Sequence, residues 1–539
     1  MTGVAATYTD YTDHPDAATR RRLSPRALRA RLVPPFTDSA LWGWIAPLLV
    51  TALAGYLRFN RLSIPGTKAF DEVYYAHDAQ SLLMYGVETG KNGPPESFGP
   101  AEYVVHPPLG KWMIGFGEWV SGYNSFGWRL SAAIVGTLSV LLVARIARRM
   151  TRSTLFGCAA GLLMCLDGLE YVQSRMAMLD IFLMFWVVVA FGFLILDRDQ
   201  VRARLASRSV AIDGPGDTRG FGPRVGFRWW LLACGVSLGC AAACKWDGAY
   251  YIPPFAILAM FWTMGAKRAA GVRKPFVSTL ARDVPGGLVT VVVVPVATYV
   301  ATWTGWFLSN AQHAYDRGWA NGRATAWGLG WVPAWLRNPV RSLWHYHWEA
   351  LNFHTHLETY HKYRSNAWGW LFLNRPVLYY ADYPHYGKLG CKTQASSGCA
   401  RMIYNLGTPA IWWASIPVMV FMLYLVFRRD WRASAVLLPF LIGYVPWLFN
   451  YKRTMFYFYA LPLLPFICIA LAITMGYLVG DRKASPNRRM VGAMVAGSYM
   501  LIVVVLFFYF LPVLSERTIP FTGWQQRMWF QSWSEDAGS

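Results

Sequence analysis

The chain has 539 residues, of which 55% are hydrophobic, 16% aromatic and only 15% charged. Because a soluble domain usually carries about 25% charged residues, this composition excludes a soluble enzyme, a disordered protein and a disulfide-dense secreted scaffold. The net charge of +22 would suit a nucleic-acid-binding protein, but the Lys and Arg residues gather in short segments between apolar blocks. This is the positive-inside pattern of a helical membrane protein, so no nucleic-acid partner is expected.

Apolar blocks of about 18–22 residues recur along the chain, a length that crosses a bilayer core of roughly 30 Å. The first forty residues are polar, and the block that begins near Leu41 is too long for a signal peptide and lacks a cleavage site. The sequence therefore predicts an all-α polytopic membrane protein with about eleven spanning helices, at residues 41–59, 128–145, 153–170, 178–196, 229–246, 248–265, 284–308, 409–427, 433–450, 455–476 and 490–511.

The basic residues predict the orientation, because Lys and Arg favour the cytoplasmic side. With a cytoplasmic N-terminus, the inside segments hold 29 Lys and Arg residues, and the two longer outside loops, about 60–127 and 309–408, hold only 14. The odd number of helices then puts the C-terminus outside. We predict a cytoplasmic tail at 1–40, a transmembrane domain at 41–511 that includes both loops, and an extracytoplasmic tail at 512–539.

Two adjacent carboxylates, Asp71 and Glu72, follow the first predicted span. Carboxylates at a membrane surface are costly unless they have partners. Because a positioned carboxylate can accept a hydroxyl proton, we predict that Asp71 is a general base and that Glu72 binds or orients a substrate. The same pair would also suit a solvated loop.

The first outside loop continues with the motif Val105-His106-Pro107-Pro108-Leu109-Gly110-Lys111. The two prolines fix the backbone and hold the imidazole of His106 and the ammonium of Lys111 at opposite ends of a rigid turn. Such a turn can present His106 to a phosphate or a sugar. A helix-entry turn with an incidental histidine is the alternative.

Four cationic residues lie at the extracytoplasmic ends of predicted spans: Arg129, Arg175, Lys245 and Arg453. Charged residues at membrane depth mark functional sites by default. Arginine matches phosphate oxygens with paired hydrogen bonds, so a pocket formed by these cations would suit the phosphate of a lipid-linked donor. The alternative is that each side chain reaches towards lipid headgroups.

The second outside loop is rich in Trp, Tyr and His, and both loops are expected to hold interfacial helices. His354, Glu358 and His361 would share one face of a helix, as zinc ligands can. The HExxH signature is absent, however, so an amphipathic helix is favoured and no metal site is predicted.

Cys391 and Cys399 lie in the same loop, flanked by Gly and Ser. That compartment permits oxidation, so they form a candidate disulfide; two free thiols are the alternative. The other six cysteines lie in apolar spans and are expected to be small buried hydrophobic residues.

In their order and spacing, these motifs resemble the protein O-mannosyltransferase family, the dolichyl-phosphate-mannose–protein mannosyltransferases of the GT-C type. The resemblance covers most of the chain. The motifs that carry it are Asp71-Glu72, His106–Lys111, Gly127–Ala133, Ser174–Asp180, Lys245–Gly248, Thr302–Phe307, Asn405–Trp413 and Arg453–Pro462.

The resemblance implies a GT-C fold and an inverting transfer of mannose from a polyprenyl-phosphate-mannose donor to Ser or Thr hydroxyls of secreted or membrane proteins. Fungal and animal members carry a β-trefoil MIR domain in the second outside loop. Here that loop is too short and too rich in Trp and His to hold one. The chain therefore resembles the actinobacterial form, with its active site on the extracytoplasmic side of the bacterial plasma membrane.

The family's chemistry also implies roles for the predicted site residues. Asp71 would accept the hydroxyl proton, and Glu72 would assist at the acceptor or at a sugar hydroxyl. Preorganised cations would stabilise the departing phosphate, so no metal or other cofactor is expected. The donor-binding residues would be His106, Lys111, Arg129, Arg175, Asp180, Lys245 and Arg453, and acceptor or sugar contacts would be Tyr74, Asn405 and Trp412.

The alternative functions are an enzyme with another acceptor and two other classes of membrane protein. A related GT-C enzyme with a lipid or cell-wall glycan acceptor would share the acidic residue after the first span. A transporter would need mid-span charges and repeated halves, and a scaffold would not need a carboxylate pair facing four cations. The sequence leaves open the acceptor proteins, the oligomeric state and whether the enzyme docks on the secretion translocon.

Overall fold

The computed structural model describes residues 25–36, 38–88, 105–209, 220–308, 331–395, 397–481 and 483–534. Most of the predicted N-terminal tail, and parts of both predicted outside loops, lie outside these ranges.

The helices in chain order are α1 (Pro25–Leu32), α2 (Trp42–Phe59), α3 (Glu72–Tyr85), α4 (Leu109–Ser121), α5 (Gly127–Thr151), α6 (Thr154–Cys165), α7 (Gly168–Gln173), α8 (Leu179–Ser209), α9 (Trp229–Cys244), η1 (Trp246–Tyr251), α10 (Ile252–Ala269), α11 (Pro275–Arg282), α12 (Val284–Leu288), η2 (Val289–Val293), α13 (Val294–Thr302), α14 (Thr304–Leu308), α16 (Ala334–His356), η3 (Ala367–Gly369), α17 (Pro409–Phe427), α18 (Trp431–Phe449), η4 (Tyr457–Leu463), α19 (Leu464–Val479), α20 (Pro486–Leu514), α21 (Phe521–Gln525) and η5 (Gln531–Trp533). The strands are β1 (Val377–Asp382), β2 (Cys399–Asn405) and β3 (Ile519–Pro520).

Among the described residues, eight helices are long and apolar enough to cross a membrane. They cover Gly127–Thr151, Leu179–Arg208, Trp246–Ala269, Val284–Thr302, Pro409–Phe427, Trp431–Phe449, Tyr457–Val479 and Pro486–Leu514. The other three predicted spans fall on α2, which has 18 residues, and on α6 and α9, which are apolar but have only 12 and 16. The chain is therefore a polytopic, mostly helical membrane protein.

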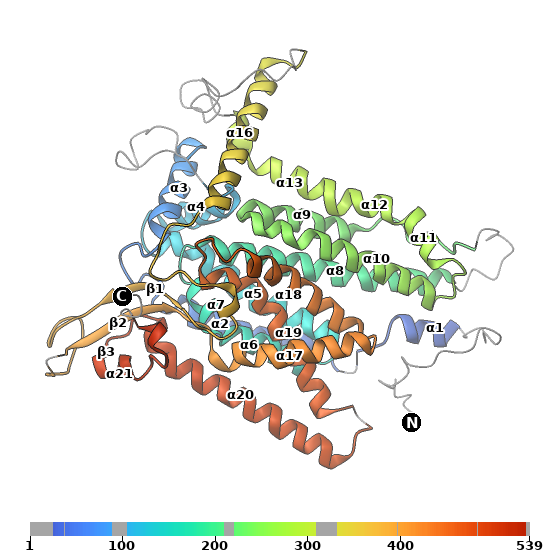
Figure 1. Cartoon of the computed structure of the whole chain (residues 1–539). Helices are drawn as coiled ribbons and strands as arrows, with labels where there is room; N and C mark the ends of the chain where they lie inside the picture. Colours follow the sequence, from blue (N-terminus) through green and yellow to red (C-terminus); the bar gives the residue numbers. More distant parts are fainter. Residues whose placement is uncertain are drawn as a thin grey trace.

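The spanning helices run alongside one another in a bundle (Figure 1). The segment Tyr457–Val479 forms its centre, since 89% of its apolar 18-residue stretch is buried in the protein. In Val284–Thr302 and Pro486–Leu514 only 17% is buried, and these two helices lie on opposite sides of the bundle in Figure 1. Apolar side chains that are exposed along a spanning helix are expected to face lipid.

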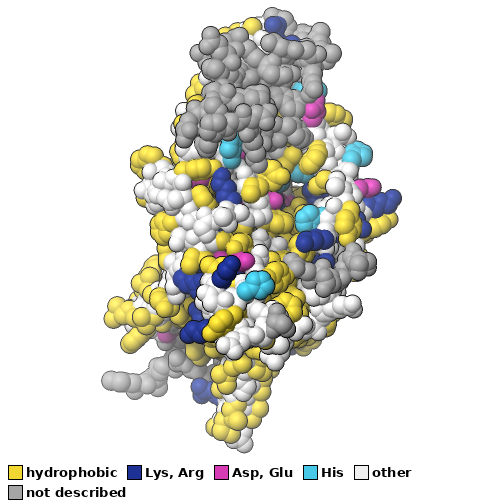
Figure 2. Space-filling view, turned by 90° about the vertical axis from the view of Figure 1, so that its left-hand side faces the viewer, with side chains coloured by type: hydrophobic (Ala, Val, Ile, Leu, Met, Phe, Trp, Pro, Cys, Tyr) yellow, Lys and Arg dark blue, Asp and Glu magenta, His cyan; other side chains and the backbone are white. Residues whose placement is uncertain are grey.

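One end of the bundle carries α3, α4, α16 and the small sheet, while α1 lies at the other end (Figure 1). Figure 2 looks onto the first end, where charged and His side chains lie among hydrophobic ones. The sheet has the order β1-β2-β3, and both strand pairs are antiparallel. The prediction of an all-α chain missed this sheet, because its strands are short and lie within a loop and the C-terminal tail.

Candidate functional site

The predicted site residues come from segments far apart in the sequence that meet at the end of the bundle with α3. Asp71 precedes α3, His106 precedes α4, Asp180 lies in the first turn of α8, and Lys245 follows α9. Arg453 lies in the turn between α18 and η4. Chain topology therefore brings together carboxylates and cations that are up to 382 positions apart.

Asp71 is half-buried at the N-terminus of α3, where its carbonyl accepts the N–H groups of Tyr74 and Tyr75. Burial raises the pKa of the Tyr75 hydroxyl well above its usual value, and the charges of Asp71 and Asp180 raise it further. Burial, Asp180 and Asp71 do the same to the pKa of Tyr379 in β1. Both hydroxyls therefore stay protonated beside the two carboxylates.

Glu72 and Arg129 form a fully buried ion pair. The Nε and Nη2 groups of Arg129 donate to the two carboxylate oxygens at 2.8 and 2.7 Å, and the same oxygens accept the N–H groups of Ala177 and Ala69. The remaining donors of Arg129 bond to backbone carbonyls of Leu62, Pro65 and Thr67. All five guanidinium donors are thus used inside the protein.

These bonds correct two expectations. Arg129 has no donor left for a phosphate, and Glu72 is enclosed rather than open to an acceptor or a sugar. The pair instead ties the chain on either side of Asp71 to α5.

Arg175 is also an internal anchor. Its Nη1 group donates to the carbonyls of Leu57, Arg58 and Asn60 at 3.2, 2.8 and 2.6 Å, and its Nη2 group to that of Arg61 at 2.9 Å. These carbonyls belong to the C-terminal end of α2, where a cation is favourable. The structure therefore favours helix capping over the predicted donor binding for Arg175.

Four basic residues, His106, Lys245, His354 and Arg453, form what we call the basic cluster. The rings of His106 and His354 stack with centroids 5.4 Å apart. His354 Nε2 donates to the carbonyl of Val105 at 2.8 Å, so its Nδ1 is the acceptor for Arg453 Nη2 at 3.2 Å. Arg453 Nε donates to the His354 carbonyl at 2.8 Å.

Both histidines of the basic cluster are neutral at pH 7. Burial lowers the pKa of His354 to about 4, against which its bond to Val105 acts, while the charges of Arg453 and Lys245 lower it further. Burial and the positive charges of Lys245, Lys111 and Arg453 place the pKa of His106 well below its usual value. His106 and His354 therefore act as neutral hydrogen-bonding groups beside two permanent cations.

Lys245 connects the basic cluster to the carboxylates. Its Nζ donates to Asp180 Oδ1 at 2.9 Å and lies 4.3 Å from the ring centroid of Tyr459. The charge of Asp180, like that of Asp71, raises the pKa of Tyr75 and of Tyr379. The Tyr75 ring, four residues after Asp71, lies 6.2 Å from that of His106, so the N-terminal part of α3 adjoins the basic cluster.

Lys111 is buried between two carboxylates that the sequence did not single out. Its Nζ lies 3.0 Å from Asp78 and 2.7 Å from Glu88. Burial lowers its pKa, but the two charges outweigh this and leave the pKa above its usual value. The positive charge of Lys111 is thus already balanced by carboxylates inside the protein. Asp78 was detectable, since it lies seven residues after Asp71 on one helix face.

The three predicted acceptor or sugar contacts differ in exposure. Tyr74 is exposed. Asn405 is buried and donates its amide to the Tyr379 hydroxyl at 2.7 Å, as does Gln173. Trp412 is also buried and donates to Asp167 at 2.8 Å, so the prediction that it contacts a sugar does not fit.

The zinc alternative does not fit the structure. Helix α16 ends at His356, and Leu357 turns away from helical geometry, so Glu358 and His361 do not continue the face of His354. Among the described residues, no group of three or more His, Cys, Asp or Glu side chains could hold a metal ion.

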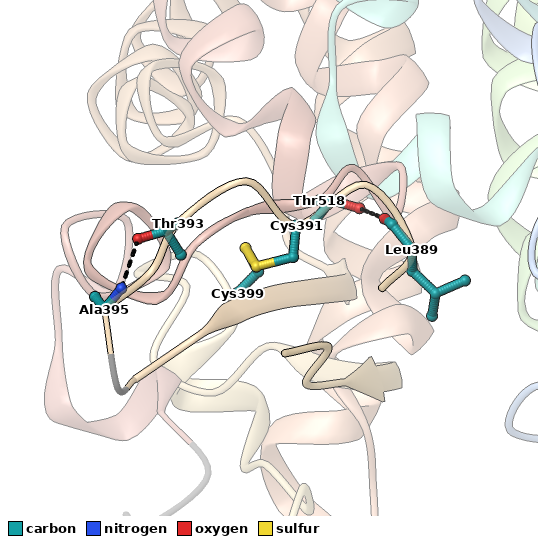
Figure 3. The surroundings of a disulfide bond; sticks show 6 residues. All are labelled: Leu389, Cys391, Thr393, Ala395, Cys399 and Thr518. Carbon is teal, nitrogen blue, oxygen red and sulfur yellow. Dashed lines mark hydrogen bonds between the residues drawn. A yellow bond between two sulfur atoms is a disulfide. The ribbon is translucent and has the colours of Figure 1, made fainter. Parts of the chain in front are cut away.

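Cys391 and Cys399 are joined in a disulfide bond (Figure 3). The bond closes the loop that precedes β2, and Thr518 fixes the same loop by donating to the carbonyl of Leu389 at 2.7 Å.

Comparison with known proteins identifies the family. A family model described as dolichyl-phosphate-mannose-protein mannosyltransferase matches residues 48–209, and one for the C-terminal four-helix membrane region of protein-O-mannosyltransferase matches residues 339–533.

Several curated relatives are called polyprenol-phosphate-mannose–protein mannosyltransferase. The one from Mycobacterium tuberculosis is 40% identical over 510 residues, which are 92% of each chain. The one from Corynebacterium glutamicum is 36% identical over 92% of this chain and 94% of its own. The solved Pmt1-Pmt2 protein O-mannosyltransferase complex of S. cerevisiae, bound to the sugar donor, shares the fold, with a TM-score of 0.69, 15% identity and coverage of 94% of this chain and 95% of that chain. This chain belongs to the protein O-mannosyltransferase family.

Proposed function

We propose that this enzyme transfers mannose from polyprenyl-phosphate-mannose to Ser or Thr hydroxyls of secreted or membrane proteins. The observation that carries the proposal is the closeness of the basic cluster to α3, which begins directly after Asp71: the Tyr75 ring lies 6.2 Å from that of His106, and Lys245 donates to Asp180 at 2.9 Å. It sets a carboxylate for the acceptor hydroxyl beside cations for the donor phosphate. The name of the 40% identical mycobacterial relative describes the same donor and a protein acceptor.

The proposed reaction is one displacement at the anomeric carbon. Asp71 accepts the hydroxyl proton while the hydroxyl oxygen bonds to that carbon, and the bond from the carbon to the phosphate oxygen breaks. The phosphate leaves with its negative charge, which Lys245 and Arg453 stabilise while the neutral His106 offers a hydrogen bond. Attack opposite the leaving group inverts the anomeric centre.

No metal is required in this proposal, because the leaving group already carries a phosphate and the protein supplies the cations. Glu72, Arg129 and Arg175 act in it as anchors rather than as contacts of the reacting groups.

The proposed site faces the extracytoplasmic side of the bacterial plasma membrane, in an arrangement with eleven spans and a cytoplasmic N-terminus. Support comes from the positions of the arginines. Arg145, Arg149 and Arg152 lie in or directly after the last turns of α5, and Arg202 donates to carbonyls of α1, which lies at the end of the bundle away from α3 (Figure 1). An arginine-rich end is expected in the cytoplasm.

The test is transfer of labelled mannose from synthetic polyprenyl-phosphate-mannose to a Ser/Thr-rich peptide, with and without EDTA. We expect Asp71→Asn to keep its fold and donor affinity while kcat falls by about 10²–10⁴-fold, and wild-type transfer to survive EDTA. Asp481→Asn is the matched control. Asp481 lies in the turn between α19 and α20, which the proposed orientation places in the cytoplasm, so this variant should keep wild-type kcat. A wild type that binds the donor but glycosylates only lipid or cell-wall acceptors would identify a related GT-C enzyme instead.

A further inference from the structure

Phe70, directly before Asp71, has a left-handed backbone with φ of 52°. A bulky residue in this region is a genuine outlier, because its Cβ crowds the backbone. Such conformations persist only when the surroundings enforce them, and they cluster at functional sites.

An aromatic cage encloses the Phe70 ring. Tyr379 stacks on it with centroids 4.8 Å apart and planes at 23°. Phe456, Phe458 and His361 meet it edge-on at 5.8, 5.9 and 6.0 Å. The stacked wall is itself fixed, since the Tyr379 hydroxyl accepts hydrogen bonds from two buried amides, those of Gln173 and Asn405. The cage thus holds the ring from three separate segments of the chain.

Hydrogen bonds fix the backbone on both sides of Phe70 and Asp71. The N–H of Ala69 donates to Glu72 Oε2 at 3.0 Å, and the Glu72 carboxylate is clamped by Arg129. Residues 69 and 72 are therefore both fixed. Any change of φ at Phe70 must therefore be compensated within Phe70 and Asp71, the two residues between these fixed positions.

We propose that Phe70 is a positioning residue for the transfer reaction: the aromatic cage holds it in the left-handed conformation and thereby fixes the direction of the Asp71 carboxylate at the N-terminus of α3. The proposal rests on the proposed role of Asp71 as the base. Phe70 contributes through the direction of Asp71 and not through contact with the sugar or the acceptor.

The decisive variant is Phe70→Leu, which keeps an apolar side chain but removes the ring from the cage. A displaced reacting group costs up to about 10²-fold in rate. We expect kcat to fall about 10–100-fold while KM for the donor changes little, and Phe70→Tyr, which keeps the ring, to restore most of kcat. Phe507→Leu is the matched control, because it removes a buried ring of α20 that meets the ring of Tyr171 edge-on at 5.5 Å; it is expected to lower Tm to a similar degree and to leave kcat unchanged.

A double-mutant cycle separates positioning from packing. If Phe70 acts through Asp71, Phe70→Leu has no further effect on kcat in an Asp71→Asn background. An equal fall in both backgrounds, or a wild-type kcat in folded Phe70→Leu, would overturn the proposal. If Phe70→Leu does not fold, Phe456→Leu removes one edge of the cage and carries the same cycle. A fully active Asp71→Asn would instead refute the proposed function, whatever Phe70 does.

Discussion

Two sets of cations lie at the same end of the bundle and differ in what surrounds them. Arg129 and Arg175 donate to internal carboxylate and carbonyl oxygens. Of the two cations of the basic cluster, Arg453 is only half-buried, and Lys245 meets one carboxylate and aromatic rings. Position at the membrane interface does not distinguish the two sets. The number of internal acceptors around each cation does, and it separates anchors from groups that remain available to a ligand.

Replacing an anchor should have the largest effect. Arg129→Met leaves the buried Glu72 carboxylate without its partner, a change that typically costs about 3–5 kcal/mol. We expect a large fall in Tm in detergent, and transfer activity should be lost because less of the protein is folded. Arg453→Met, the matched change in the basic cluster, should lower Tm much less.

The double variant Glu72→Leu/Arg129→Met tests whether the unpaired Glu72 carboxylate causes the fall in Tm. Removing both charges leaves no unpaired group, so part of the lost Tm should return. A folded Arg129→Met with wild-type Tm and weakened donor binding would show that Arg129 belongs with the phosphate site after all.

Replacing a member of the basic cluster should weaken donor binding instead. Lys245→Gln removes a charged donor, and a hydrogen bond to a charged group contributes about 1.5–3 kcal/mol, so the donor Kd should rise by about 10–100-fold. The control is Lys111→Gln. Since Asp78 and Glu88 already neutralise Lys111, that change should lower Tm more than donor affinity. Equal losses of affinity in both variants would remove the distinction between the two lysines.

A smaller effect is expected from acid. His354 has a folded-state pKa of about 4, below its usual 6.5, so the unfolded chain binds a proton between these values and the folded chain does not. Stability contributed by the neutral ring is therefore complete above about pH 6.5 and lost as the pH falls towards 4. Wild-type Tm should drop over this range, and His354→Gln should flatten the drop. Parallel curves for the two proteins would show that His354 is not the titrating group.

The sequence predicted the features that depend on composition along the chain. Apolar blocks located the eight described helices that are long and apolar enough to cross a membrane, and the order of motifs such as His106–Lys111 pointed to the family. The partners of individual charges were not predictable. Glu72 and Arg129 are 57 residues apart, and nothing in either segment says that Arg129 will find a carboxylate and three carbonyls. The sequence offered His354 as a zinc ligand or as part of an amphipathic helix. Its place in the basic cluster depends on Val105 and Arg453, which are 249 and 99 positions away.

The disulfide should matter for stability and not for transfer. Cys391 and Cys399 are eight positions apart, and a cross-link over so short a loop contributes about 2–3 kcal/mol by restricting the unfolded chain. The bond lies at the end of the hairpin where Asp382 pairs with Arg401, whereas Tyr379 lies towards the other end and is held by Gln173 and Asn405. Cys391→Ser/Cys399→Ser should therefore lower Tm and leave kcat with a peptide acceptor within about twofold of wild type, because the cage around Phe70 does not depend on the loop. A large fall in kcat at unchanged donor affinity would mean that the hairpin loop itself contacts the acceptor.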